Sequence, residues 1–384
     1  MGLPGDLERR VRRHLARLDT MGLRRQMRPP SGVDFSSNDY LGLSAHPLLK
    51  QRMAEAVSKE GCGSTGSRLL RGQRVAFADV ESRFAAFKQT EAALFFGSGY
   101  AANLAVLSVF PESGDIVFSD ELNHASLIDG LRLSRARRVI FPHCSAGALE
   151  QMLETEKGAG QKFLVTESLF SMDGDQAPLR DYAALCRATG TALIVDEAHA
   201  VGIYGARGSG LMEATGVDGD VFLSINTAGK AMGVGGAFVA GPLWAVDFLV
   251  QRARPFVFST APPPSMAAAL DAALTVIAEE PQRRALLIER VCFLRRRLAE
   301  AGLDVSPEGS QIIPLMIGDN SRALAVAAAL QAQGFDVRAI RPPTVPPGTA
   351  RLRISVNVGA DEATLSRFAA ALSAALRPCA TAPA

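Results

Sequence analysis

Short apolar runs alternate with segments of helical periodicity between about residues 41 and 241, and this alternation limits the chain to a small group of folds. The runs are rich in Val, Ile, Leu and Phe, which is typical of strands in a parallel sheet that is covered on both faces. We therefore expect an α/β fold whose large domain contains a mainly parallel seven-stranded sheet. The predicted strands are Ala92–Phe96, Asp115–Phe118, Arg138–Phe141, Phe163–Val165, Ala192–Val195, Val221–Ile225 and Gly236–Ala240.

The segments on either side of this block predict an arm and a smaller domain. At 384 residues the chain exceeds the size at which a single core usually stops growing. An amphipathic helical pattern precedes the block, and a Pro-rich stretch at 261–264 follows it. Strand patterns at 311–317, 336–340 and 352–357 then alternate with helical patterns. We divide the chain into an N-terminal helical arm (1–40), a large domain (41–280) and a small C-terminal α+β domain (281–384).

Charge and cysteine usage exclude several functional classes. The 41 basic residues exceed the 39 acidic ones by only two, so no electrostatic argument favours a nucleic-acid partner. The arginine-rich N-terminus lacks the apolar core of a secretory signal, and no apolar run approaches the ~20 residues that span a bilayer. The cysteines stand singly, without His or Cys partners at metal spacing. We expect a cytoplasmic protein with no metal and no membrane partner. The cysteines are Cys62, Cys144, Cys186, Cys292 and Cys379.

Polar residues follow the predicted strands at their carboxyl ends, where open α/β sheets bind their ligands. His124, after the second strand, could stack on a planar cofactor, and His199 could support a nearby carboxylate. A structural, hydrogen-bonded role is the alternative for both histidines. The other residues in such positions are Gly97–Tyr100, Thr166–Glu167, Asp196 and Asn226–Lys230.

Asp196 and Lys230 are the two of these residues that most strongly indicate chemistry. Asp196 ends an apolar strand, where an ionised carboxylate is costly unless a donor or a cation such as a protonated pyridine nitrogen pairs with it. Lys230 lies in a loop of small residues, which would give a cofactor access to its amine for a Schiff base. The plainer alternatives are a helix-capping aspartate and a solvated lysine.

Gly97-Ser98-Gly99 opens a helical pattern and would offer backbone N–H groups to a phosphate. With Ala102, the same glycines also match the dinucleotide fingerprint G-x-G-x-x-A, so a nicotinamide-dependent oxidoreductase is the alternative from another enzyme class. That alternative leaves Asp196 and Lys230 without a role.

Five strings of the sequence together resemble the α-oxoamine synthases, which are pyridoxal-phosphate enzymes of the aspartate-aminotransferase-like fold type I. The strings occur in that family's order across nearly the whole chain. They are Asn38-Asp39-Tyr40-Leu41-Gly42-Leu43, Gly63-Ser64-Thr65-Gly66-Ser67-Arg68, Ser171-Met172-Asp173-Gly174-Asp175, Asp196-Glu197-Ala198-His199 and Thr227-Ala228-Gly229-Lys230.

The resemblance implies how the cofactor is held. Lys230 would carry pyridoxal 5'-phosphate as a Schiff base, Asp196 would bind its pyridine nitrogen, and His124 would cover the ring. Ser171 and His199 would contact the phenolic oxygen. The residues around the phosphate would be Ser98, Gly99, Tyr100, Thr227 and, from a second subunit of a homodimer, Thr260.

The resemblance also implies an acyltransferase and its substrates. Arg353 would hold the carboxylate of an amino acid, and Asn38 would lie close to the substrate. Arg24 would contact the acyl substrate, and Arg341 would also bind substrate. The string Ile340–Arg353 favours the members that condense L-alanine with a pimeloyl thioester, on coenzyme A or acyl carrier protein, in biotin biosynthesis. The nearest alternative is the member that uses glycine and succinyl-CoA. A catalytically inactive subunit is a further alternative, against which the presence of Lys230 argues.

Overall fold

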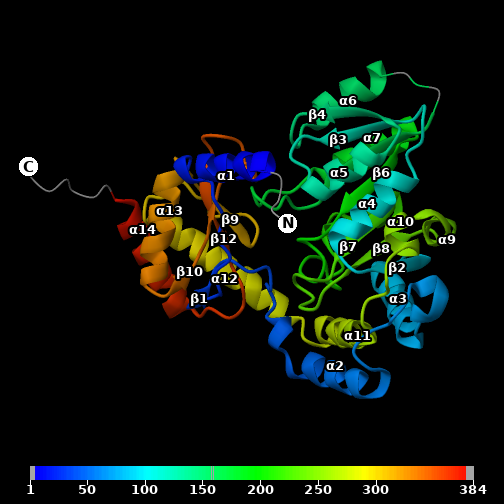
Figure 1. The fold of residues 1–384 in the computed structure, drawn as a ribbon, viewed down its shortest axis with the longest axis horizontal. Coiled ribbons are helices and arrows are strands. Elements are labelled where there is room, and N and C mark those ends of the chain that lie inside the picture. The colour runs from blue at the N-terminus through cyan, green and yellow to red at the C-terminus, as the bar shows by residue number, and fades with distance from the viewer. Residues whose placement is uncertain (1–4, 157, 159, 378–384) are drawn as a thin grey trace, which may run out of the picture. The chain divides into compact units, whose positions relative to one another are not determined.

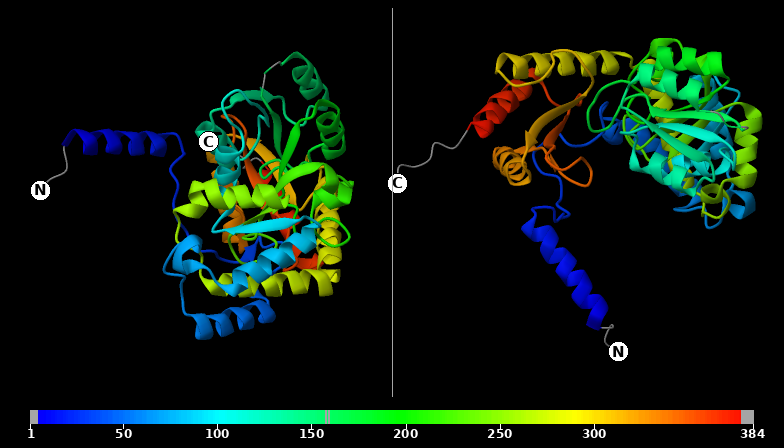
Figure 2. Two further views of the ribbon diagram at one scale, coloured as in Figure 1. Left: turned by 90° about the vertical axis from the view of Figure 1, so that its right-hand side faces the viewer. Right: turned by 90° about the horizontal axis from the view of Figure 1, so that it is seen from above.

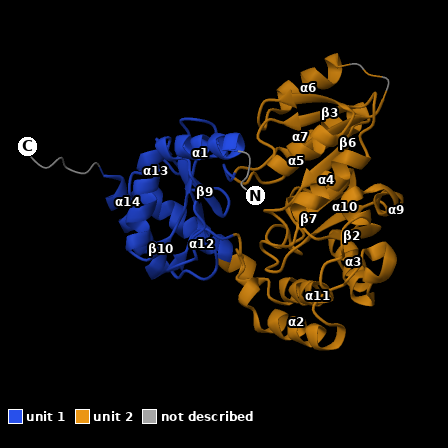
Figure 3. Ribbon diagram, in the orientation of Figure 1, with its two compact units in different colours: residues 1–37, 172–174, 287–384 blue, residues 38–171, 175–286 orange. Residues whose placement is uncertain are grey.

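The structure, a computed structural model, describes residues 5–156, 158 and 160–377, so Cys379 lies outside the described residues. The chain forms two compact units, each assembled from separate segments (Figure 3). Unit 1 combines the segments 1–37, 172–174 and 287–384, as far as they are described, and unit 2 combines 38–171 and 175–286. The division into an arm and two domains at residues 40 and 280 stays a prediction.

A seven-stranded sheet forms the centre of unit 2 (Figure 1). Its strands are β2 (Ala92–Phe96), β3 (Ile116–Asp120), β4 (Arg137–Phe141), β5 (Lys162–Glu167), β6 (Ala192–Asp196), β7 (Val221–Thr227) and β8 (Ala237–Gly241). They lie in the order β2-β8-β7-β6-β5-β3-β4, and only β8 runs opposite to the other six. The seven predicted strands and the mainly parallel α/β sheet are confirmed.

Helices cover both apolar faces of this sheet, because successive side chains of a strand point to opposite faces. Leu94 and Phe96 of β2 pack with helices α4, α5, α9 and α10 on one face. Phe95 points to the other face, where Phe238 of β8 stacks on Phe84 of α3 with ring centroids 4.1 Å apart. The α-helices of unit 2 are α2 (Pro47–Glu60), α3 (Val75–Lys88), α4 (Gly99–Val109), α5 (Ala125–Leu133), α6 (Ala146–Thr155), α7 (Leu179–Thr189), α8 (Leu211–Thr215), α9 (Leu243–Arg252), α10 (Arg254–Val257) and α11 (Pro264–Glu279).

Unit 1 contains a three-stranded antiparallel sheet in the order β11-β12-β9 and a parallel pair of β1 and β10. Phe35, from the N-terminal segment, stacks on Phe368 of the last helix with ring centroids 3.9 Å apart, and this contact joins the two ends of the chain in one core. The elements are α1 (Gly5–Thr20), β1 (Val33–Asp34), α12 (Gln282–Glu300, which begins in unit 2), β9 (Ile312–Gly318), α13 (Asn320–Ala332), β10 (Phe335–Asp336), β11 (Ala339–Ile340), β12 (Ala350–Ser355) and α14 (Glu362–Leu376).

The single strand expected over 336–340 is wrong, because the chain turns within it. The Val337 N–H donates to the Phe335 carbonyl at 3.0 Å, and the Arg338 side chain folds back onto Asp336 at 2.6 Å. β10 and β11 therefore pair with different strands.

Helix α1 extends away from the rest of unit 1 in both views of Figure 2. None of its residues is buried, and apolar side chains such as Leu7 and Val11 are exposed along it. No helix within the described residues is long and apolar enough to cross a membrane.

A fully buried ion pair supports the loop that follows β6. Lys88, the last residue of α3, donates to the Glu197 carboxylate at 2.8 Å and to the Ser209 carbonyl at 2.6 Å. The side chains of Lys88 and Glu197 are both completely inaccessible. The second oxygen of Glu197 accepts the backbone N–H groups of Leu211 and Met212, so this carboxylate joins α3 to the start of α8.

We predict that Lys88→Met lowers the free energy of unfolding by about 3–5 kcal/mol, because it leaves the buried carboxylate of Glu197 without its cation. Adding Glu197→Gln should recover much of the loss, since the amide keeps an acceptor for the two backbone N–H groups. Urea unfolding of both variants measures this, and Lys50→Met, at an exposed lysine of α2, is the matched control. A double variant no more stable than Lys88→Met would contradict the explanation.

Candidate active site

The carboxyl ends of neighbouring strands bring several polar side chains together in unit 2. Glu167 ends β5 and Asp196 ends β6, and the two residues are paired in register across these strands. Thr227 ends β7, and Lys230 follows it by three residues in the turn toward β8. The structure thus places these residues at the carboxyl ends of neighbouring strands, and their functional roles stay predictions.

Asp196 is a buried carboxylate that is held by neutral donors. Its Oδ2 accepts from the Asn103 amide at 2.8 Å, and its Oδ1 accepts from the Ala198 N–H at 2.9 Å. Asp196 is only 4% exposed, and it takes part in no ion pair among the described residues. A buried carboxylate in such surroundings fits a cationic partner such as a protonated pyridine nitrogen.

Asn103 also connects Asp196 to His124. The same amide donates to Ser126 Oγ at 2.8 Å, and Ser126 Oγ lies 2.7 Å from His124 Nδ1. Burial and the charge of Lys230 lower the pKa of His124, although Asp196 opposes the shift. The imidazole is therefore neutral at pH 7, as suits a ring that covers an aromatic cofactor.

Lys230 lies at the end of a chain of hydrogen bonds. Its Nζ is 2.7 Å from His199 Nε2, and His199 Nδ1 is 2.8 Å from the Tyr40 hydroxyl. Tyr40 donates its proton to Asn38 Oδ1 at 2.9 Å. Because the hydroxyl proton is directed to Asn38, the Tyr40 oxygen accepts from His199 Nδ1–H, and the lone pair of Nε2 points to Lys230. His199 thus contacts the lysine amine rather than the Asp196 carboxylate.

The N-terminus of α4 and the end of β7 approach each other closely enough to form a phosphate cradle. Ser98 caps α4 by accepting the Ala101 N–H at 3.1 Å. A Cβ atom on Gly99 would lie 2.3 Å from Thr227 Oγ1, so only glycine permits this approach. The free N–H groups and positive dipole end of a helix fit a phosphate, and the donor set at both ends of the site therefore suits pyridoxal phosphate.

The other residues predicted around the cofactor are less enclosed within the chain. Tyr100 is 44% exposed, and its hydroxyl bonds to Asp129. Thr260 is exposed after α10, and Ser171 is half-buried in the loop after β5. Their contacts with a cofactor stay predictions.

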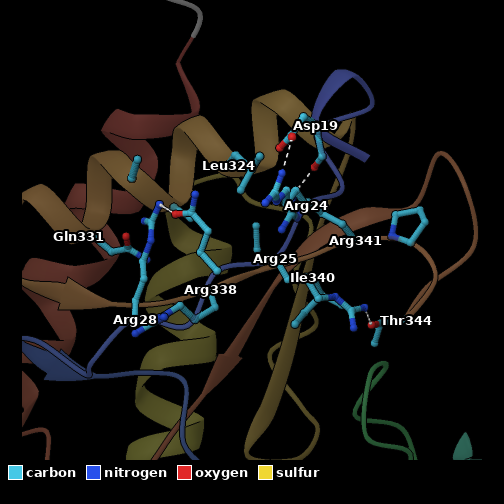
Figure 4. Close-up of a pocket in the computed structure, with 16 residues that line it drawn as sticks. Asp19, Arg24, Arg25, Arg28, Leu324, Gln331, Arg338, Ile340, Arg341 and Thr344 are labelled. Carbon is cyan, nitrogen blue, oxygen red and sulfur yellow. Dashed lines mark hydrogen bonds and ion pairs between the residues drawn. The ribbon is translucent and has the colours of Figure 1, made fainter. Parts of the chain in front are cut away.

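Arg24 and Arg341 meet in a cavity of about 660 Å³ within unit 1 (Figure 4). Arg24 pairs with Asp19 at 2.7 Å, and Arg341 donates to the Gly22 carbonyl while its Nε is buried without a hydrogen-bond partner among the described residues. Burial and the nearby Arg25 lower the pKa of Arg341. The residues that line the cavity include one aspartate and five arginines, which are Arg24, Arg25, Arg28, Arg338 and Arg341. This excess of positive charge suits an anionic ligand.

Arg353 lies elsewhere in unit 1, on β12. It is 7% exposed and donates to Ser355 Oγ at 2.7 Å. A guanidinium binds a carboxylate with two parallel hydrogen bonds, so this buried arginine fits a carboxylate ligand. The role of Arg353 stays a prediction. The role of Asn38 also stays a prediction, although hydrogen bonds through Tyr40 and His199 connect it to Lys230.

Sequence reasoning assigned no role to three residues that the structure brings into the site. Asn103 is a polar residue on the apolar side of α4, and that position was the available signal. Tyr40 lies within one of the family-like strings, and Glu167 follows a predicted strand. Glu167 is buried, and its Oε1 accepts the His124 N–H at 2.7 Å.

Comparisons with known proteins agree with this geometry. The family model for aminotransferase class I and II matches residues 30–372. A curated 8-amino-7-oxononanoate synthase from Anaeromyxobacter dehalogenans is 48% identical over 94% of both chains, and one from Geobacter sulfurreducens is 43% identical over 96% of this chain and 98% of the relative.

Two solved structures share the fold. A serine palmitoyltransferase with pyridoxal phosphate has a TM-score of 0.90 at 28% identity and covers 98% of this chain and 99% of its own. An 8-amino-7-oxononanoate synthase from Francisella tularensis has a TM-score of 0.78 at 29% identity and covers 90% of this chain and 97% of its own.

We predict that Glu167→Gln reduces the pH dependence of stability between about pH 5 and pH 8. Burial, reinforced by Asp196, raises the pKa of Glu167 to about 8, so the folded chain keeps a proton that the unfolded chain releases above its ordinary pKa of about 4.3. The stability of the wild type therefore falls as the pH rises through this interval, by at most about 1.4 kcal/mol per unit. Gln keeps the acceptor for His124 without titrating.

Urea unfolding of both proteins at several pH values measures the effect. The stability of the variant relative to the wild type should rise from pH 5 to pH 8 and level off above it. A difference that stays constant across this range would show that Glu167 carries no raised pKa.

Proposed function

The chain belongs to the aminotransferase class I and II family and, within it, to the 8-amino-7-oxononanoate synthases, and from this premise we propose that it condenses L-alanine with a pimeloyl thioester. The reaction joins the alanine Cα to the thioester carbonyl and releases a thiol and carbon dioxide. Its product is 8-amino-7-oxononanoate, an intermediate of biotin biosynthesis. The observation that carries the proposal is that a buried Asp196, with no ion pair among the described residues, ends β6 while Lys230 follows the end of the neighbouring β7.

The cofactor is pyridoxal 5'-phosphate, which fits the donor set of unit 2. When bound, it supplies an electron sink for the electrons of the bonds that break at the amino acid Cα. Asp196 would keep a positive charge on the pyridine nitrogen, and the neutral His124 would cover the ring. Ser98, Gly99 and Thr227 provide the phosphate cradle described above.

Lys230 moves the proton in this proposal. Its Nζ takes the proton from the alanine Cα, and His199 Nε2, 2.7 Å away, holds the amine in place and shares its proton. The Tyr40 and Asn38 hydrogen bonds keep the His199 tautomer that presents a lone pair to the lysine. A buried Arg353 would bind the alanine carboxylate and so orient the Cα–H bond.

The arginine-lined cavity of unit 1 supports an acyl substrate with an anionic end. A pimeloyl chain carries a free carboxylate opposite to its thioester, and Arg24 and Arg341 would bind that group. Succinyl-CoA shares this feature, so the cavity fits both acyl chains and the family relationship favours the pimeloyl one.

A cytoplasmic homodimer is the assembly that we propose. Thr260, predicted to reach the phosphate of a second subunit, is exposed in the single chain. Phe258, two residues before it, is a large apolar side chain that is 71% exposed. Isologous dimers are the commonest symmetric assembly of soluble enzymes.

We predict that Lys230→Ala lowers kcat by more than about 10³-fold, because it removes the group that moves the proton. Product formation measured by mass spectrometry gives kcat, and Lys50→Ala is the control at an exposed lysine. Retention of at least a tenth of the activity in Lys230→Ala would remove Lys230 from the reaction.

The substrate prediction is tested by measuring kcat/KM for every combination of alanine, glycine or serine with a pimeloyl or a succinyl thioester. We expect the highest kcat/KM for alanine with a pimeloyl thioester, and Arg24→Ala with Arg341→Ala should raise the KM of the acyl substrate without changing the KM of alanine. Preference for glycine with succinyl-CoA would overturn the substrate assignment and leave the reaction class intact.

A further inference from the structure

Four side chains of the types that bind metals gather in unit 2 outside the site described above. Asp120 is the last residue of β3, His143 and Cys144 follow β4, and Asp175 lies in the loop between β5 and α7. None of them belongs to the predicted catalytic or cofactor-binding set. The sequence predicted no metal site here, because these residues are either far apart along the chain or directly adjacent.

Cys144, His143 and Asp175 direct one ligand atom each toward a common point. His143 Nε2 lies 3.6 Å from Cys144 Sγ and 2.7 Å from Asp175 Oδ2, and Cys144 Sγ lies 3.9 Å from the same oxygen. Zinc bonds of about 2.0–2.3 Å in a tetrahedral site place ligand atoms roughly 3.3–3.6 Å apart. The two separations that involve Cys144 Sγ are near this range. The 2.7 Å between His143 Nε2 and Asp175 Oδ2 is shorter, so Asp175 must withdraw by about 0.6 Å when zinc binds. Its side chain is 44% exposed and therefore has room to move.

The backbone of Cys144 explains how two adjacent residues converge. Cys144 has φ of 52°, in the left-handed region that residues other than glycine rarely adopt. Its N–H donates to Asp120 Oδ2 at 2.9 Å, which holds the residue in this conformation. The thiol is thereby turned back toward the imidazole of its neighbour.

Asp120 fixes the orientation of His143. Its fully buried carboxylate bonds to His143 Nδ1 at 2.8 Å, so Nε2 is the nitrogen that faces Cys144 and Asp175. A carboxylate on the far nitrogen of a ligand histidine is the usual support of a metal-binding imidazole.

Two buried polar atoms beside the cluster lack hydrogen-bond partners among the described residues. They are the hydroxyl of Tyr182, a residue with no exposed surface, and Asp175 Oδ1. The Tyr182 ring packs edge-on against Phe141, the last residue of β4, which lies two residues before His143. A water on a metal ion could serve such a group, since buried polar atoms are rarely left unpaired.

Two simpler explanations account for less of the structure. A reactive cysteine needs a thiolate, whereas burial raises the pKa of Cys144. A bridging imidazolium fits better: burial opposes protonation, but the bonds to Asp120 and Asp175 raise the pKa of His143 to about 12. It leaves the Tyr182 hydroxyl without a partner among the described residues, and it gives no role to the Cys144 thiol, which lies 3.6 Å from His143 Nε2.

We propose that His143 Nε2, Cys144 Sγ and Asp175 Oδ2 bind one Zn²⁺ ion, with Asp120 supporting His143 and a water as the fourth ligand. One thiolate, one imidazole and one carboxylate form a ligand set that zinc accepts. Zinc binds a thiolate and a neutral imidazole, so its affinity for this site should rise with pH. The ion would join the segment after β4 to the loop that contains Ser171 and Asp175.

The test uses the holoenzyme of the full, untagged chain after treatment with a chelator. Calorimetric titration with zinc chloride should show one site per chain, and Co²⁺ should give the near-ultraviolet absorption of a cobalt thiolate. Cys144→Ser should abolish the cobalt signal and weaken zinc binding by at least 100-fold. Cys62→Ser and Cys292→Ser, at exposed free cysteines, are the matched controls and should leave both signals unchanged.

Asp120→Asn probes the supporting carboxylate, and its expected effect is a 10–100-fold loss of zinc affinity with Cys144 still contributing the cobalt signal. Circular dichroism and urea unfolding verify that each variant is folded before titration. If the wild type binds no zinc in this titration, or binds it equally well as Cys144→Ser, the proposal is wrong.

Discussion

The buried carboxylate of Asp196 is the constraint on which the rest of the site depends. An anion at the end of an apolar strand is unfavourable unless donors and a cation surround it. Among the described residues, the donors to this carboxylate are the neutral amide of Asn103 and the backbone N–H of Ala198. This leaves the charge available to a ligand, and it accounts for why a cofactor with a protonated ring nitrogen fits this position.

The neighbouring groups are arranged so that their protonation states are compatible with that charge. Glu167 lies beside Asp196 with a raised pKa and is therefore mostly protonated at neutral pH. His124 has a lowered pKa and is neutral. Asp196 and Lys230 are the two charged groups of this site that the proposed reaction uses.

Buried charges outside the site follow the same rule with different partners. Lys88 neutralises Glu197, and this pair holds the segment that begins directly after Asp196. His143 lies between Asp120 and Asp175, and there the adjacent thiol of Cys144 adds a ligand atom that an ion pair alone does not require. Loops at the carboxyl ends of the strands thus carry both the proposed reaction and the proposed zinc site.

The sequence by itself determined the sheet and the residues at its carboxyl edge, because apolar runs and the polar residues that end them are local signals. Strands β2 to β8 appear where the alternation predicted them, and Asp196, Lys230 and His124 could be selected from their positions after strands.

The sequence did not reveal the partners of the site residues, which are Asn103 for Asp196, Tyr40 for His199 and Glu167 for His124. Hydrogen bonds between residues distant in the chain form only when helices pack on the sheet, and the break between β10 and β11 likewise follows from a turn held by Phe335 and Asp336. Tertiary structure alone also brought Asp120 and Asp175 to His143 and Cys144, since no local pattern encodes a cluster drawn from three separate loops.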